Sequence, residues 1–173
     1  MNSISDKNYI VKPLEKKLEN LSETDNVKFR EYLASGDIIS ANKLIGTQFS
    51  ISGPVVHGKG LGRTVGMPTA NIKVPEDSLL PLSGVYGVSS ILDGRRVAGL
   101  VNLGTRPSVD DSSKITIEVY FLDFEGDLYG REISISFLHY LRPILKLPGI
   151  EAVKEQVLKD VVAFKEFLKE ENC

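Results

Sequence analysis

The sequence predicts a mainly β protein: a six-stranded antiparallel closed β-barrel with a C-terminal helix and a short helical extension at the N-terminus. Residues 48–138 consist of short β-branched runs separated by Gly, Pro and Asp, which is the pattern of a small antiparallel sheet. Before and after this region, the apolar residues recur at helical spacing. Six strands of this length favour closure, because a closed barrel leaves no edge exposed.

The composition narrows the functional class. The chain has 173 residues, 42% of them hydrophobic, which predicts one principal domain with a small appendage. With 21 basic and 23 acidic residues, it lacks the broad positive field that a nucleic-acid backbone requires. The single cysteine, Cys173, excludes an internal disulfide and favours the cytoplasm. We expect no membrane contact, since no apolar run approaches the roughly 18 residues of a membrane span.

The first fifty residues predict helices. Leu14, Leu18 and Leu21 predict one short helix, and two more follow from the remaining apolar positions, which are Phe29, Leu33, Ile38, Ala41, Leu44 and Ile45. We expect breaks near Asp25 and at Gly36, with Gly36 just beyond a helix C-terminus and Asp37 as the next N-cap. The predicted boundaries are a helical extension over residues 1–46 and a barrel domain over residues 47–173.

The strands follow in order from the β-branched runs. The predicted hairpin turns are Asp93-Gly94 and, after Leu122-Asp123, Glu125-Gly126, because these residues accept positive φ angles. The predicted strands are Phe49 to Val56, Ala70 to Val74, Gly84 to Leu92, Arg96 to Leu103, Lys114 to Leu122 and Glu132 to Leu138.

The end of the chain predicts an amphipathic helix packed on the barrel. Its apolar stripe is formed by Ile150, Val153, Val157, Val161, Phe164 and Leu168.

A glycine-rich segment, residues 53–71, holds the strongest local signal. Five glycines, Lys59 and Arg63 lie within it. Glycines let backbone N–H groups approach an anion, so the segment is either a phosphate-binding loop or a glycine-rich loop without a ligand. A P-loop is excluded, because Gly60 follows the G-x-x-x-x-G-K match and the next residues do not favour a helix.

Within this segment, Pro68-Thr69-Ala70-Asn71, together with the upstream glycines and Arg63, resembles the G-x-P-T-A-N signature of riboflavin kinases. Further blocks follow in the expected order at residues 80–81, 84–86, 102–107, 118–124, 126–130 and 141–143. The resemblance covers about Gln48 to the end of the last helix. It implies a Greek-key barrel that uses ATP and Mg²⁺ to phosphorylate the ribityl 5′-hydroxyl of riboflavin, giving FMN and ADP. We expect a monomer.

The resemblance also assigns residue roles. Glu118 is implied as the catalytic base; the residues alone equally describe a solvated carboxylate on an amphipathic strand. Thr69 and Asn71 are implied as Mg²⁺ ligands. They lie two apart and carry hard oxygen donors, but they also suit a strand entry and a turn. The implied ATP-binding residues are Gly58, Gly60, Gly62, Arg63, Thr69 and Asn71.

The flavin-binding residues implied by the resemblance are Phe121, Asp123, Arg142 and Leu147. Arg142 has an alternative role in a salt bridge to the terminal helix. Ile144 and Leu147 stand where the family has an acidic and an aromatic residue. This departure favours the alternative of a non-catalytic flavin or nucleotide sensor on the same barrel.

Residues 29–37 and 41–46 resemble the tail of the FMN adenylyltransferase domain that precedes this kinase in bacterial relatives. That activity in the family needs a nucleotide-binding body with an H-x-G-H type motif, but the chain has only His57 and His139. We therefore expect no adenylyltransferase activity. An oligonucleotide-binding barrel is a third possibility from strand count alone, although the chain has no tryptophan and its net charge is -2.

Overall fold

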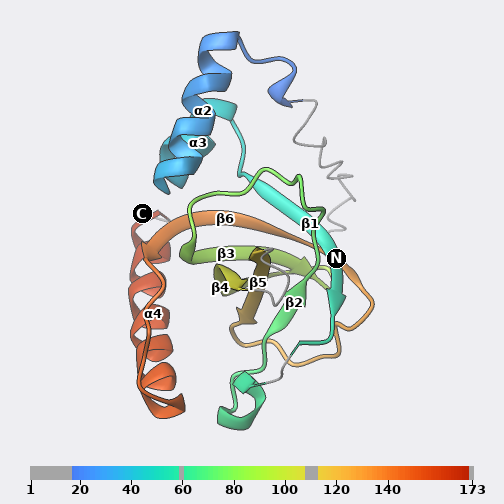
Figure 1. Ribbon diagram of the computed structural model, residues 1–173, viewed down its shortest axis with the longest axis vertical. Coiled ribbons are helices and arrows are strands. Elements are labelled where there is room, and N and C mark those ends of the chain that lie inside the picture. The colour runs from blue at the N-terminus through green and yellow to red at the C-terminus, as the bar shows by residue number, and fades with distance from the viewer. Residues whose placement is uncertain (1–16, 59–60, 108–112, 172–173) are drawn as a thin grey trace, which may run out of the picture.

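The computed structural model describes residues 17–58, 61–107 and 113–171 (Figure 1). Along these ranges the elements are α2 (Glu23–Ser35), α3 (Ile38–Ile45), β1 (Ser50–Val56), the 3₁₀ helix η1 (Leu61–Val65), β2 (Ala70–Ile72), β3 (Gly84–Leu92), β4 (Arg95–Pro107), β5 (Ser113–Phe121), β6 (Glu132–Arg142) and α4 (Ile150–Glu171).

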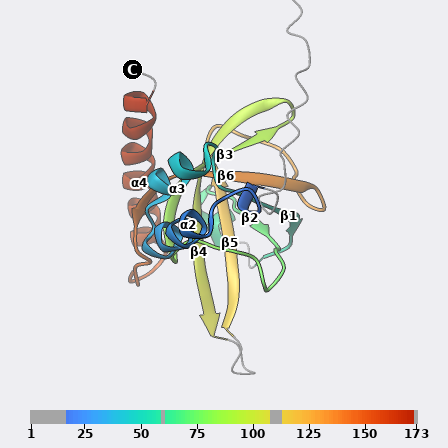
Figure 2. The same ribbon diagram turned by 90° about the horizontal axis from the view of Figure 1, so that it is seen from above.

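The strands in the described ranges close into one barrel, which confirms the predicted fold class. Their order around the barrel is β1-β2-β5-β4-β3-β6, and each paired neighbour is antiparallel. Strand β5 therefore lies between β2 and β4, although β3 follows β2 in the chain. Figure 2 shows β4 and β5 as a long ribbon extending beyond the rest of the barrel.

Buried residues alternate with more exposed ones along β1, and α2 and α3 close one end of the barrel (Figure 1). Phe29 and Leu33 of α2 are buried in the same apolar cluster as Phe49 and Phe137 of the barrel. The ring centroids of Phe29 and Phe49 are 6.1 Å apart, and those of Phe49 and Phe137 are 5.5 Å apart. The helical segment thus shares the barrel's core.

The helix boundaries confirm two expectations and correct one. Gly36 has a φ of 78° and donates its N–H to the Leu33 carbonyl, and Asp37 caps α3. The break expected near Asp25 lies slightly earlier, at residues 19–22, because the N-cap of α2 is Ser22; Asp25 lies in the first turn, where a carboxylate is favourable. Leu14 lies outside the described residues.

Of the two predicted turns, one is confirmed and one is wrong. Asp93 and Gly94 have φ angles of 50° and 75°, which confirms the β3–β4 hairpin. The expected turn at Glu125-Gly126 is wrong: the positive φ angles in this connection lie at Asp123 and Gly130, at the two ends of a long loop. Strands β4 and β6 also run farther than predicted, to Pro107 and Arg142, whereas β2 ends at Ile72.

Helix α4 packs along the outside of the barrel, as predicted (Figure 2). Phe164 is fully buried with Leu100 and Leu122. Its ring lies against Gly87 of β3, where an added Cβ would come within 2.1 Å of the ring. Ile150 and Val153, at the start of the predicted stripe, remain exposed. No helix in the described ranges has both the length and the apolar character of a membrane span.

Candidate functional site

Three polar side chains stand in one row across neighbouring strands. Asn71 of β2 is paired with Glu118 of β5, and Glu118 is paired with Asn102 of β4. Directly paired residues point to the same side of a sheet, with Cβ atoms about 5 Å apart. Val119 and Val101, the next residues along β5 and β4, are fully buried inside the barrel, so the row faces outward.

The row opens into a cavity of about 300 Å³ between the barrel and α4, called here the helix-side pocket. Val153, Val157 and Asp160 of α4 form part of its wall. Six of the predicted site residues meet there, from both the phosphate and the flavin sets: Gly62, Thr69, Asn71, Glu118, Arg142 and Leu147.

Exposed aliphatic side chains gather on the same pocket. Ile144, Leu145, Ile150 and Val153 are all exposed and all line it. Isolated exposed apolar residues are ordinary, but a contiguous group at a cavity marks a ligand surface. The pocket therefore combines an apolar wall with the polar row of Asn71, Glu118 and Asn102.

Arg142 has the alternative role that the sequence left open, the salt bridge to the terminal helix. Its Nε and Nη2 donate to the carboxylate of Asp160 at 2.9 and 2.7 Å, and Nη1 donates to the Pro143 carbonyl. Gln156 also donates to Asp160, which is only 4% exposed. Arg142 still lines the pocket, so it both anchors α4 and borders the cavity.

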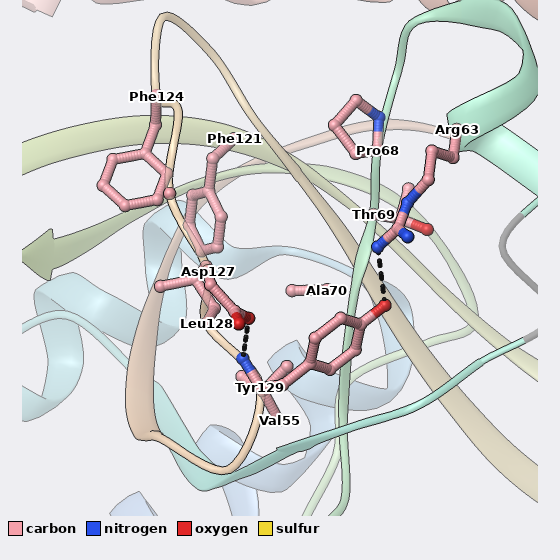
Figure 3. Close-up of a pocket in the computed structure, with 11 residues that line it drawn as sticks. Val55, Arg63, Pro68, Thr69, Ala70, Phe121, Phe124, Asp127, Leu128 and Tyr129 are labelled. Atoms are coloured by element: carbon pink, nitrogen blue, oxygen red, sulfur yellow. Dashed lines mark hydrogen bonds between the residues drawn. The ribbon is translucent and has the colours of Figure 1, made fainter.

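A second cavity of about 360 Å³ lies beside Thr69 and is called here the loop-side pocket (Figure 3). Arg63 donates to the Tyr129 hydroxyl at 2.9 Å, and His57 stacks on the Tyr129 ring with centroids 3.9 Å apart. Phe121 borders this cavity from the barrel. Thr69 lines both pockets, so the two cavities adjoin at this residue.

The structure separates some of the predicted residues. Phe121, expected with the flavin set, lines the loop-side pocket together with Arg63. Asp123 lines neither of these two pockets; it is exposed, and its carboxylate lies 4.0 Å from the Lys165 ammonium. Gly60 lies outside the described residues.

Thr69 and Asn71 fit the expected Mg²⁺. The hydroxyl and the carboxamide are hard oxygen donors on one side of the strand entry, and Mg²⁺ takes few protein ligands beside substrate phosphates. Gly58 makes room for this arrangement, because an added Cβ would lie 2.1 Å from the Asn71 amide nitrogen. The glycine thus allows the Asn71 side chain to lie close to the start of the loop.

Sequence reasoning missed Asn102, Asp160 and Tyr129. The alternation of Val101, Asn102 and Leu103 along β4 marks Asn102 as outward-facing. The pairing of β4 with β5, which sets Asn102 opposite Glu118, depends on barrel closure and carries no local signal. For Asp160, the sequence indicated only that the residue lies on the predicted C-terminal helix, and nothing pointed to a role at the site.

The fold and the site define a class: a closed antiparallel β-barrel with a helix-walled outer pocket and an adjoining pocket that holds Arg63 and Asp127. Residues 45–168 match the model of the riboflavin kinase (flavokinase) family. The chain belongs to this family.

Curated relatives agree with the family match. The chain is 35% identical over 156 residues to the bifunctional riboflavin kinase/FMN adenylyltransferase of Listeria monocytogenes, covering 90% of this chain and 50% of that protein. It is 40% identical over 138 residues to the protein of the same name from Pseudomonas fluorescens, covering 80% and 44%. The chain thus spans about half the length of these relatives.

Solved structures show the same barrel. A protein described as a macrolide-efflux protein from Streptococcus pneumoniae aligns with a TM-score of 0.75 at 28% identity, over 83% of this chain and 46% of that chain. The riboflavin kinase from Trypanosoma brucei aligns with a TM-score of 0.50 at 26% identity, over 69% and 79%.

Proposed function

We propose that this chain transfers the γ-phosphate of ATP to the ribityl 5′-hydroxyl of riboflavin, giving FMN and ADP. The observation that carries the proposal is the position of Glu118. It lies beside Asn71 in a pocket with an apolar wall, and that pocket adjoins a second one containing Arg63. Phosphoryl transfer needs positioned substrates, neutralised phosphate charge and a group that accepts the nucleophile's proton.

The helix-side pocket is proposed as the riboflavin site. Its exposed aliphatic wall, with Leu147 among the lining residues, suits the face of the apolar flavin ring. Glu118 then accepts the proton of the terminal ribityl hydroxyl. Arg142, which borders the pocket while bound to Asp160, holds the α4 wall against the barrel beside the flavin.

The loop-side pocket is proposed as the nucleotide site. Arg63 supplies a guanidinium for phosphate oxygens, and the backbone near Gly58 and Gly62 lets phosphates approach. Phe121 lines this pocket and not the helix-side pocket, so we assign it to the nucleotide rather than to the flavin. Asp123 has no role in this arrangement. The two substrates would meet at Thr69, which borders both cavities.

Thr69 and Asn71 would hold Mg²⁺, which neutralises phosphate charge when bound. Thr69 immediately precedes β2, and Asn71 is paired with Glu118 on β5. The barrel therefore sets the distance between the metal ligands and the base. This rigid placement supplies the orientation that the transfer requires.

We further propose that this chain lacks FMN adenylyltransferase activity and that the protein is a cytoplasmic monomer. We also propose the division into an N-terminal extension over residues 1–46, of which 1–16 lie outside the described residues, and a kinase domain over residues 47–173. Its two histidines stack on aromatic rings, His57 on Tyr129 and His139 on Phe167. Such partners do not form the paired-histidine motif of adenylyl transfer. Incubation with FMN, ATP and Mg²⁺ should give no FAD, and FAD formation would refute this part.

The kinase proposal is tested by incubating the protein with riboflavin, ATP and Mg²⁺ and separating the flavins and nucleotides by chromatography. We expect FMN and ADP in equal amounts. Quenching of riboflavin fluorescence measures binding in parallel. Binding without FMN would replace the kinase by the sensor alternative, and the absence of both would refute a flavin site.

A further inference from the structure

We propose that Asn102 is a specificity-determining residue for the acceptor, whose carboxamide binds a secondary hydroxyl of the ribityl chain. The inference rests on the proposed function, because it names a further contact in the same pocket. It adds a polar partner to a site in which the candidate base accounts for the terminal hydroxyl alone.

The strand register places Asn102 beside the candidate base. Asn102 of β4 is the direct partner of Glu118 of β5, and Val85 of β3 follows Asn102 in the same row. Paired positions share a face with Cβ atoms about 5 Å apart. A five-carbon chain whose end reaches Glu118 therefore passes within reach of a side chain at position 102.

The Asn102 carboxamide is available for a ligand. It is exposed, lines the helix-side pocket, and makes no side-chain hydrogen bond within the described ranges. Asn42 shows the contrasting structural case: its carboxamide donates to the Phe137 carbonyl at 2.9 Å and accepts from the Phe49 N–H at 2.6 Å. The Asn102 carboxamide makes no comparable structural hydrogen bonds in the described part of the chain.

The chemistry of the pocket favours a polyhydroxyl chain as the partner. Beside the strand row, the wall consists largely of aliphatic side chains, which offer no hydrogen bonds. Secondary hydroxyls that move from water into an aliphatic pocket need hydrogen-bond partners there. A carboxamide can both donate to and accept from a hydroxyl, so Asn102 meets this need next to the base.

The test compares two acceptors in the full chain. Riboflavin carries three secondary hydroxyls, whereas a flavin with a 5-hydroxypentyl side chain keeps only the terminal alcohol. Asn102→Ala should lower kcat/KM for riboflavin about tenfold, the effect of one lost hydrogen bond. The same substitution should leave kcat/KM for the hydroxypentyl flavin and the KM for ATP unchanged.

Asn102→Ser, which keeps a hydroxyl, should restore part of the loss. Thr116→Ala is the matched control, since Thr116 lies on the same face of β5 but lines neither pocket. An equal loss with both flavins, or no loss with riboflavin, overturns the inference. Failure of the wild-type protein to form FMN would instead overturn the proposed function, so the two failures are distinguishable.

Discussion

Arg142 on β6 and Asp160 on α4 form an ion pair in which two guanidinium nitrogens contact both carboxylate oxygens. The Asp160 side chain is 4% exposed and that of Arg142 is 18% exposed. Since Asp160 also lines the helix-side pocket, this pair fixes the wall of the proposed flavin site to the barrel.

Removing the charge at Asp160 should destabilise the protein. Asp160→Asn leaves Arg142 without its counter-charge in a largely buried place, so we expect the free energy of unfolding to fall by about 3 kcal/mol. Urea denaturation measures the change. The exposed pair Lys159–Glu155 on the same helix provides the control, and Glu155→Gln should not shift the transition. Equal transitions for wild type and Asp160→Asn would contradict a structural role for the pair.

Phe164 should couple stability to flavin binding. Its ring is fully buried against Gly87, so Phe164→Ala should cost about 3 to 5 kcal/mol. Because α4 walls the helix-side pocket, the KM for riboflavin should rise more than the KM for ATP. Val162→Ala, at an exposed position of the same helix, should leave both constants unchanged. A loss confined to the KM for ATP would show that α4 does not border the flavin.

Gly58 should matter for metal binding more than for folding. In Gly58→Ala the new methyl group would collide with the Asn71 carboxamide, and this half-buried side chain can rotate away at small cost. We expect stability within about 0.5 kcal/mol of wild type, a higher Mg²⁺ requirement and about tenfold slower turnover. Titration of the rate with Mg²⁺ measures this. Gly104→Ala, where an added Cβ makes ordinary contacts, is the control, and equal Mg²⁺ curves would oppose the metal role of Asn71.

His139 should make stability depend on pH. Burial lowers the pKa of His139 from its ordinary value of 6.5, and Glu171 opposes this only in part. The unfolded chain therefore binds a proton at a higher pH than the folded protein does, so stability decreases as the pH falls below about 6.5. Between pH 7.5 and pH 5.5 the wild type should lose more unfolding free energy than His139→Gln. An identical loss in the two proteins would contradict this account.

Much of the fold follows from local pattern. Alternation along β5 predicted the strand that carries Glu118, and the stripe through Phe164 predicted the packing face of α4. Capping chemistry identified Gly36 and Asp37 correctly. The turn at Gly126 was wrong because a glycine permits a positive φ without requiring one, and the long β5–β6 loop uses Asp123 and Gly130 instead.

The site was less accessible to sequence reasoning. The glycine-rich segment and the family resemblance brought Thr69, Asn71 and Glu118 forward, and the structure places all three in one pocket. Glu118 is paired with Asn102 because β5 lies between β2 and β4 in the barrel. Long-range pairing of this kind has no local signature, and neither has the division between two cavities that sets Phe121 apart from Arg142.

The most direct test of the account is the rate of FMN formation by Glu118→Gln, measured with riboflavin and MgATP at saturation. Glutamine keeps the size of the side chain but cannot accept the hydroxyl proton. We expect the rate to fall at least about 100-fold, the usual contribution of a positioned base, while riboflavin binding stays near the wild-type value. A rate within about threefold of wild type would contradict the role of Glu118 and the active site built around it.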